Sequence, residues 1–269
     1  MLYKEPQIAP DWIEKMELEA ELEAEPRGEA PSFVPPPAVP VLLLAGDPVV
    51  YHACQLDLAG RPVLIHILES LKAASVPHVE ITTPPGDIDI LPLVESAAAP
   101  IPPVIVTGQG DIGALAGMAV AQSYPNPVGL LVLEANRLLH PTILKRMTHD
   151  HRENLLLSDF SGVMPRGSIK LQINVDQQIL RYSAELNGLV AQGVSLGVLK
   201  IGSRALDEIR ARIRREELTR LSDMVRWVVT ENMVHAVAGE NFSSLRVRGR
   251  ADLEGALERL EFLSQAGSE

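Results

Sequence analysis

The chain has 269 residues, 46% of them apolar and 22% charged, which indicates a globular protein with a sizeable core rather than a disordered or fibrous one. Its net charge of −11 and its aromatic content of only 4% argue against a nucleic-acid partner, because such sites need clustered lysine and arginine or stacked rings. One cysteine excludes a disulfide framework and a cysteine-rich zinc site, and no apolar run approaches the ~18 residues of a membrane span, so we expect a cytoplasmic protein without membrane contact.

Residues 1–40 are expected to form an acidic, proline-rich tail and linker. Residues 1–30 contain nine acidic and three basic residues and therefore carry −6 of the net charge. The five prolines between residues 31 and 40 cannot continue a helix and indicate a stiff, extended linker. Residues 11–25 have the composition of a short helix, and two interpretations stay open: a solvated acidic tail, or a docking helix that offers Trp12 to a protein partner.

From residue 41 to residue 269 we expect one α/β domain, because strand and helix patterns alternate. Four apolar runs are each followed by a helical pattern, which predicts a three-layer, doubly wound, mostly parallel sheet of the Rossmann-like type. The predicted strands are residues 39–46, 78–85, 103–108 and 127–135. The predicted helices are residues 61–74, 88–99, 111–123 and 141–151.

The second half of the domain has a different pattern. Alternating residues and turn signals predict an antiparallel β insertion at residues 155–185, followed by a strand at residues 193–202. Two helices, two short strands and an amphipathic terminal helix are predicted at residues 205–218, 222–232, 235–239, 243–249 and 251–265. The apolar face of the terminal helix leaves a homo-oligomer open.

A glycine pattern of the dinucleotide-binding type follows the third predicted strand. Gly108, Gly110 and Gly113 form G-x-G-x-x-G at the start of a predicted helix, and Glu134 ends the next strand along the chain. Such glycines let a backbone approach a pyrophosphate, and the acid would accept hydrogen bonds from ribose hydroxyls. One hypothesis is therefore an NAD-binding protein. The alternative is a turn that lets a small-residue helix start close to the sheet.

A series of segments, in order from about residue 40 to residue 265, resembles the sugar-phosphate nucleotidyltransferase superfamily, and most of all its cytidylyltransferases. The segments of the parallel half are VPVLLLAG (39–46), LDLAGRPVLIHILESLKAASV (56–76), GQGDIGALAGMAVAQ (108–122) and LLVLEANRLLHPTILKRM (130–147). Residues 161–185, 191–210 and 221–260 continue the series. The resemblance implies the nucleotide-diphospho-sugar transferase fold and, in an active enzyme, Mg²⁺-dependent transfer of a nucleotidyl group from a nucleoside triphosphate to a sugar or polyol phosphate.

The resemblance also implies the residues of the site. It places the nucleotide against Ala45, Gly46, Gly108, Gly110, Gly113 and Ala114. It places the substrate against Asp159, Lys170 and Glu185. Asn136 corresponds to the first metal-binding acid, with Glu134 two residues away, and Arg248 corresponds to the second. Glu134, Asn136 and Arg248 are therefore the candidate catalytic residues, and Glu134 is the candidate metal ligand.

The sequence departs from the superfamily where the triphosphate and the metal are bound. The segment that begins at Gly46-Asp47-Pro48 contains neither the arginine nor the lysine of active relatives, and Asp47 would repel a triphosphate. Arginine cannot bind Mg²⁺, which needs oxygen ligands, although Arg248 and Arg250 could replace the charge of the metal against an anion. We expect a degenerate, non-catalytic protein that binds a nucleotide or sugar phosphate, or that serves as an assembly or regulatory subunit. The alternatives are an active nucleotidyltransferase and the NAD-binding protein.

Overall fold

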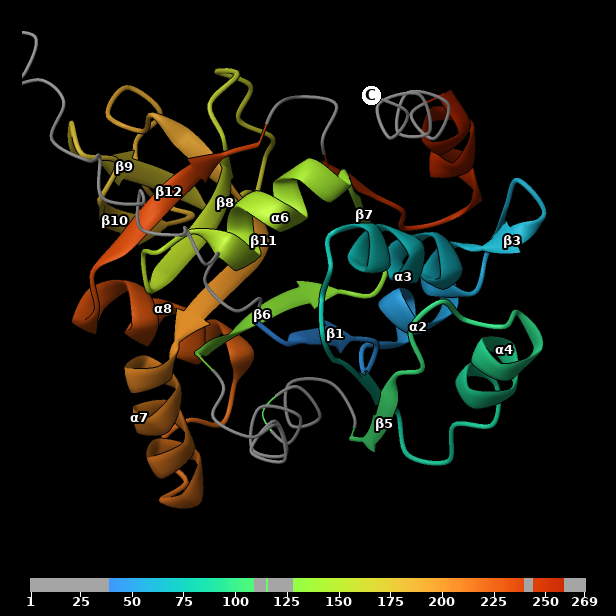
Figure 1. Ribbon diagram of the computed structural model, residues 1–269. Coiled ribbons are helices and arrows are strands. Elements are labelled where there is room, and N and C mark those ends of the chain that lie inside the picture. Colours follow the sequence, from blue (N-terminus) through green and yellow to red (C-terminus); the bar gives the residue numbers. More distant parts are fainter. Residues whose placement is uncertain (1–38, 109–114, 116–127, 240–243, 259–269) are drawn as a thin grey trace, which may run out of the picture. The chain divides into compact units, whose positions relative to one another are not determined.

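The computed structural model describes residues 39–108, 115, 128–239 and 244–258 (Figure 1). Within these residues, nine strands form one sheet, and helices cover both of its faces. The predicted tail with Trp12, the predicted helix at residues 111–123 apart from residue 115, and the end of the terminal helix lie outside the described residues. The linker and the docking role of Trp12 therefore stay predictions.

Four parallel strands form one half of the sheet. They are β1 (Val41–Leu44), β4 (Val79–Thr83), β5 (Val104–Thr107) and β6 (Gly129–Glu134), and their order is β5-β4-β1-β6. The chain adds β4 and β5 on one side of β1 and then returns to add β6 on the other side. Strand order therefore reverses between β1 and β6, and a ligand site is expected at the carboxyl ends of these two strands.

The other half of the sheet is mixed, as the β insertion predicts. Strand β11 (Gly193–Gly202) runs antiparallel to β6 and pairs with both β8 (Asn154–Asp159) and β9 (Lys170–Ile173). Strand β10 (Ile179–Ser183) pairs with β9, and β12 (Val234–Ala238) runs parallel to β8. A separate antiparallel pair joins β7 (Arg137–Leu139) to β13 (Ser244–Arg246).

Two apolar cores lie on opposite faces of the sheet, which confirms the three-layer, doubly wound prediction. Because strand side chains alternate, Leu43 of β1 packs into one core and Leu42 into the other. The first core is covered by α2 (Pro48–Cys54), α3 (Val63–Ala73), α4 (Ile90–Ser96) and α6 (Pro141–His149). The second core is covered by α7 (Ser203–Arg214) and α8 (Leu221–Glu231).

Several short elements are absent from the sequence-based prediction. Helix α2 follows β1 directly and buries Val50 and Tyr51 in the first core. Strands β2 (Asp57–Leu58) and β3 (Arg61–Pro62) form a hairpin whose turn places Gly60 at φ +79°, a conformation that glycine adopts without strain. The 3-10 helix η2 (Arg250–Asp252) precedes helical residues 253–258. No described helix combines the length and apolar character that crossing a membrane requires.

Candidate functional site

A cavity of about 740 Å³ lies beside the carboxyl ends of β1 and β6, where strand order reverses. Its lining combines apolar and polar side chains, which come from β1, β6, β8, β10, β11 and α8 and the segments beside them. The apolar lining includes Leu44, Val132, Leu199 and Met224, and the polar lining includes Glu134, Tyr182, Glu185, Ser195 and Arg226. A cavity of this size suits a small organic ligand, since such sites usually occupy ~300–1,000 Å³.

The connection from β1 to α2 is short and closed by its own side chain. Asp47 is the N-cap residue of α2, and its Oδ1 accepts hydrogen bonds from the amides of Val49 (2.9 Å) and Val50 (3.2 Å). Pro48 has no amide to offer, and the amide of Ala45 already donates to the Thr82 carbonyl (3.0 Å). The amides that an anion would meet at this helix start are therefore bound within the protein.

Helix α2 is fastened to the loop that follows β4. Tyr51 Oη donates to Asp87 (2.6 Å) and lies 3.0 Å from Asp89. Burial, followed by these hydrogen bonds, raises the pKa of Tyr51 well above its usual range. Burial of Asp87 opposes its ionisation, but the bonds from Tyr51 and from the amides of Asp89 and Ile90 outweigh it and lower the pKa of Asp87. The loop–helix unit after β1 is thus fixed by its own contacts.

Two arginines hold the carboxylate of Glu134 at the end of β6. Arg246 Nη2 lies 2.5 Å from Glu134 Oε1, and Arg137 Nη2 lies 3.5 Å from Glu134 Oε2. Arg137 and Arg246 are directly paired in the β7–β13 ladder, and Arg137 Nη1 also donates to Ser244 Oγ (3.2 Å). Only 7% of Arg137 is exposed, and burial lowers the pKa of its guanidinium to about 10, despite the attraction of Glu134.

Asn136 and Arg248, the other two candidate catalytic residues, meet at the same place. Asn136 is fully buried, and its Nδ2 donates to the Val247 carbonyl (2.6 Å) while its Oδ1 has no hydrogen-bond partner. Arg248 is exposed, its amide donates to Asp252 (2.7 Å), and its charge contributes to the lowered pKa of Arg137. Arg250 is exposed at the start of η2. Asn136 therefore fastens the Arg248 segment to the sheet.

The three predicted substrate residues have different positions. Glu185 lines the cavity. Asp159 accepts a hydrogen bond from the Ser161 amide (2.8 Å) in a turn, and Lys170 Nζ donates to the carbonyls of Ala184 (3.2 Å) and Leu186 (2.9 Å). Neither Asp159 nor Lys170 lines the cavity, and their contacts lie within the insertion, so their assignment to a substrate stays a prediction.

The geometry does not support the dinucleotide hypothesis. Gly108 follows β5, its amide donates to the Thr83 carbonyl (2.6 Å), and β4 and β1 separate β5 from β6. Three strand spacings, about 14 Å, therefore lie between the strands that end at Gly108 and at Glu134, whereas the acid of a dinucleotide site ends the strand adjacent to the glycine turn. Glu134 is also bound by guanidinium groups. Gly110, Gly113 and Ala114 lie outside the described residues.

The sequence-based prediction missed Arg137 and Arg246. The signal was present for Arg246, because residues 244–248 alternate and Arg246 and Arg248 stand two positions apart in an extended segment. Nothing in the sequence indicates that Arg137 and Arg246 share one carboxylate, since Arg246 and Glu134 are 112 positions apart.

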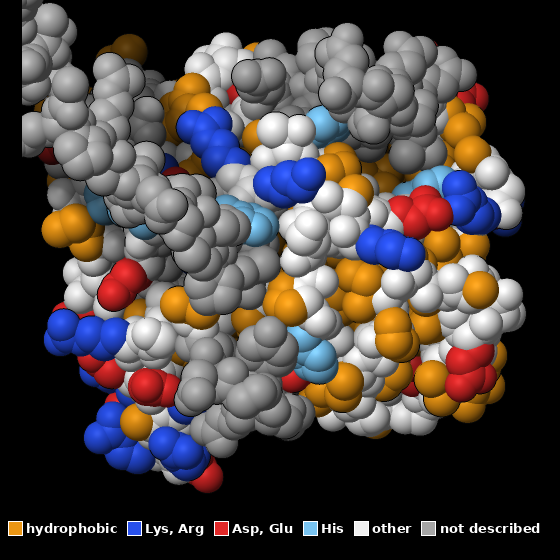
Figure 2. All heavy atoms as spheres, in the orientation of Figure 1, with side chains coloured by type: hydrophobic (Ala, Val, Ile, Leu, Met, Phe, Trp, Pro, Cys, Tyr) orange, Lys and Arg blue, Asp and Glu red, His pale blue; other side chains and the backbone are white. Residues whose placement is uncertain are grey.

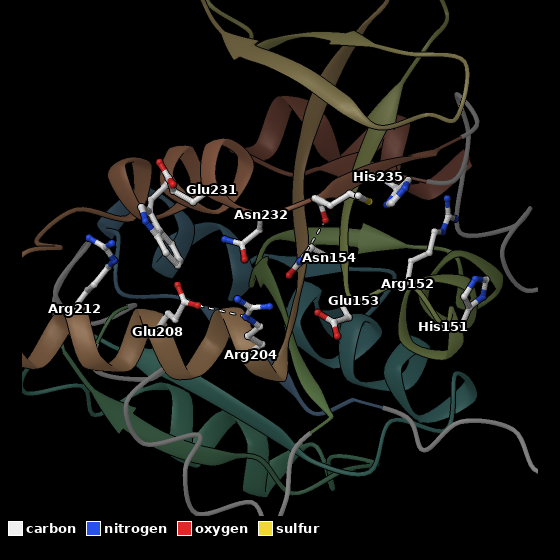
Figure 3. Close-up of a pocket in the computed structure, with 12 residues that line it drawn as sticks. His151, Arg152, Glu153, Asn154, Arg204, Glu208, Arg212, Glu231, Asn232 and His235 are labelled. Carbon is white, nitrogen blue, oxygen red and sulfur yellow. Dashed lines mark hydrogen bonds and ion pairs between the residues drawn. The ribbon is translucent and has the colours of Figure 1, made fainter.

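A second cavity has a volume of about 560 Å³ and lies at the amino ends of β8 and β12, between these strand starts, α7 and the end of α8 (Figure 3). Basic side chains gather over α7 in the lower left of Figure 2, and Arg204 and Arg212 of this helix line the cavity. Its charges are largely compensated: Arg204 pairs with Glu208 (3.6 Å), and Arg212 pairs with Glu217 (3.1 Å) and covers the Trp227 ring (4.8 Å). Among the described residues, no cluster of histidine, cysteine and acidic side chains could hold a metal ion.

Asp150, the residue that ends α6 beside this cavity, should make the stability of the protein depend on pH. The hydrogen bonds from Arg152, including Nη2 to Oδ2 at 2.6 Å, outweigh burial and lower the pKa of Asp150 to about 2. Because the folded-state pKa lies below the unfolded value of about 3.9, the stabilisation is present above pH 4 and is lost as the pH falls toward 2.

Asp150→Asn should lower the free energy of unfolding by about 1–2 kcal/mol at pH 7, and urea titrations should show the difference shrinking below pH 4. Asp176→Asn, at an exposed turn, should change nothing; an Asp150→Asn effect that is the same at every pH would contradict this assignment.

Solved structures of similar fold share this architecture. The inositol-1-phosphate CTP transferase from T. maritima has a TM-score of 0.65 at 14% sequence identity, over 86% of this chain and 98% of that one. A candidate glucose-1-phosphate thymidylyltransferase from Bacillus anthracis, in complex with a sucrose, has a TM-score of 0.63 at 11% identity, over 82% and 94%. HddC from Yersinia pseudotuberculosis has a TM-score of 0.60 at 11% identity, over 82% and 99%.

The sequence itself matches no protein-family model and no curated protein. The likeness therefore lies in the fold. The chain has the nucleotidyltransferase-like α/β fold of the inositol-1-phosphate CTP transferase and of the candidate glucose-1-phosphate thymidylyltransferase.

Proposed function

We propose that this chain is a non-catalytic protein of the nucleotidyltransferase fold. It binds a nucleotide or a sugar phosphate in the cavity at the carboxyl ends of β1 and β6. The observation that carries the proposal is the connection from β1 to α2. Transfer of a nucleotidyl group requires amides and cations that stabilise the charge developing on the triphosphate. Here Asp47 occupies the amides of Val49 and Val50, and residues 45–54 contain no lysine or arginine.

The residues at the expected metal position do not fit Mg²⁺. Magnesium takes several oxygen ligands in a near-octahedral arrangement. Both oxygens of Glu134 are engaged by guanidinium groups, Asn136 is fully buried, and Arg248 supplies a positive charge instead of a carboxylate. Binding a cation at Glu134 would also leave buried Arg137 without its ion pair, which is unfavourable. We therefore derive no metal-dependent step for this site.

The cavity supports the binding half of the proposal. Leu44, Val132 and Met224 provide apolar surface for a ring, while Tyr182 and Ser195 provide hydroxyl groups. The similar structures carry the names of enzymes for inositol-1-phosphate and glucose-1-phosphate, and phosphorylated rings of that kind match a cavity whose lining is both apolar and charged. Binding without transfer suits a sensor or regulatory subunit.

A ligand panel tests the proposal. The full chain is heated with CTP, UTP, ATP, GTP, NAD, glucose-1-phosphate or inositol-1-phosphate, each with Mg²⁺ and with EDTA. We expect at least one phosphorylated ligand to raise the Tm in EDTA, by a shift that increases with concentration. Ser222→Trp, which fills the cavity from α8, should remove the shift, and Ser96→Trp on α4 should retain it. A shift in wild type that survives Ser222→Trp, or no shift with any ligand, would overturn the proposal.

A further inference from the structure

We propose that Arg137 and Arg246 form a metal-free site for a phosphoryl group at the Glu134 end of the cavity, so that guanidinium groups replace a cation there. The inference rests on the proposed function, because it names the group of the ligand that this cavity would hold. It concerns binding only and includes no bond-forming step.

The first observation is an excess of positive charge at one carboxylate. Arg137 and Arg246 both form ion pairs with Glu134. Burial is the main cause of the lowered pKa of Arg137, and the positive charges of Arg246 and Arg248 lower it further. Asp252 uses Oδ2 to accept a hydrogen bond from the backbone amide of Arg248 (2.7 Å). One carboxylate cannot neutralise three guanidinium groups, so a bound anion would relieve their repulsion.

The second observation is unused hydrogen-bonding capacity. A guanidinium group has five N–H donors. Arg137 uses Nη1 for Ser244 and Nη2 for Glu134, and Arg246 uses Nη2 for Glu134, while the Nε atoms of both arginines have no partner. Unpaired donors at buried positions are unfavourable, and a tetrahedral phosphate offers several acceptor oxygens in the geometry that arginine binds best.

The third observation is the closeness of the cavity wall to Arg137. Gly197 lines the cavity at an irregularity of β11 and has φ +73°, where an L side chain is strained. A Cβ atom at this position would lie 3.6 Å from Arg137 Nη2. Gly197 therefore brings the cavity wall next to the guanidinium group of Arg137 without a side chain in between. Arg246, whose side chain is 35% exposed, is reachable as well.

These observations select a phosphate monoester over a neutral sugar. With a dianionic phosphoryl group at Arg137 and Arg246, the attached ring would meet the apolar part of the cavity lining, which includes Val132 and Leu199. Glu134 opposes the anion electrostatically but keeps both arginines in position through its ion pairs. Glu134→Gln removes this charge and keeps one acceptor oxygen for the two arginines, so it should tighten phosphate binding.

The test uses inorganic phosphate as the probe and the full chain in EDTA, with binding measured by calorimetry and by ³¹P NMR. Wild type should bind phosphate with a dissociation constant that Mg²⁺ leaves unchanged. Arg246→Gln should weaken binding about 10-fold or more, Arg246→Lys should weaken it less, and Glu134→Gln should tighten it several-fold. Arg204→Gln, the same charge change at the opposite edge of the sheet, should leave binding unchanged.

Several outcomes would overturn the inference. Phosphate binding that requires Mg²⁺ would assign the charge to a metal, and an equal loss in Arg204→Gln and Arg246→Gln would reveal diffuse attraction. If Arg246→Gln fails to fold, Arg246→Lys and Glu134→Gln still decide the question by their opposite directions. If a sugar phosphate binds and Ser222→Trp blocks it, while Arg246→Gln has no effect, the proposed function stands and this inference alone fails.

Discussion

Replacing Gly129 by alanine should destabilise the protein more than the same substitution at any other described glycine of the sheet. Gly129 opens β6 and faces Gly202 of β11 in the ladder that joins the parallel half to the insertion. A Cβ atom at Gly129 would lie far inside the contact distance of the Ile201 carbonyl oxygen and 3.4 Å from the Gly202 Cα. Because both neighbours are backbone atoms, the strands must separate, and we expect a loss of about 3 kcal/mol or more.

Urea unfolding and thermal unfolding measure this effect. A loss of 3 kcal/mol corresponds to a fall in Tm of about 6–12 °C for a domain of this size. Gly188→Ala is the matched control, because a Cβ atom at Gly188 meets nothing within 4 Å. Equal stability of the Gly129→Ala and Gly188→Ala variants would show that β6 and β11 do not pair in this register.

Glu134→Ala should also be strongly destabilising, and the sign of the effect distinguishes two roles for this carboxylate. A carboxylate kept for a metal is usually unfavourable to the metal-free fold, so its removal should stabilise the protein. In this structure Glu134 compensates Arg137, which is 7% exposed, and Arg246. Its removal leaves an uncompensated buried charge, so we expect the free energy of unfolding in EDTA to fall by about 2–3 kcal/mol. The loss is smaller than for a fully buried ion pair, because the Glu134 side chain is 25% exposed.

The control for Glu134→Ala is Glu208→Ala. Glu208 pairs with Arg204 on the exposed surface of α7, so its removal should change the free energy of unfolding by less than about 0.5 kcal/mol. Glu134→Ala and Arg246→Gln should not be additive, since each change removes the same ion pair. A Glu134→Ala variant that is more stable than wild type would contradict the role assigned to this ion pair.

The parallel half of the fold could be predicted because its strands are buried on both faces. Residues such as Leu42, Leu43, Leu131 and Val79 are almost completely buried, and a continuous apolar run reflects that environment. Helix α2 was missed because seven residues are too few to establish a helical period. The start of α2 could nevertheless be predicted, because aspartate is a favoured N-cap residue and proline a favoured first residue of a helix, and Asp47 and Pro48 occupy these positions.

The candidate site could be predicted only in part. Glu134 and Asn136 follow from the end of a recognisable strand, and Arg248 follows from the order of segments along the chain. The ion pairs of Glu134 could not be predicted, because Arg246 reaches it across 112 positions through the pairing of β7 with β13. Short strands of three residues carry too little periodicity to reveal their partners.

The most direct test of the account is release of pyrophosphate. The full chain is incubated with Mg²⁺, each of CTP, UTP, ATP and GTP, and the sugar or polyol phosphate that gives the largest Tm shift. With Asp47 on the amides of α2 and Arg246 on Glu134, we predict no pyrophosphate above the protein-free control, together with ligand binding in EDTA. Mg²⁺-dependent release that increases with protein concentration and disappears in Glu134→Gln would contradict the account and identify an active nucleotidyltransferase.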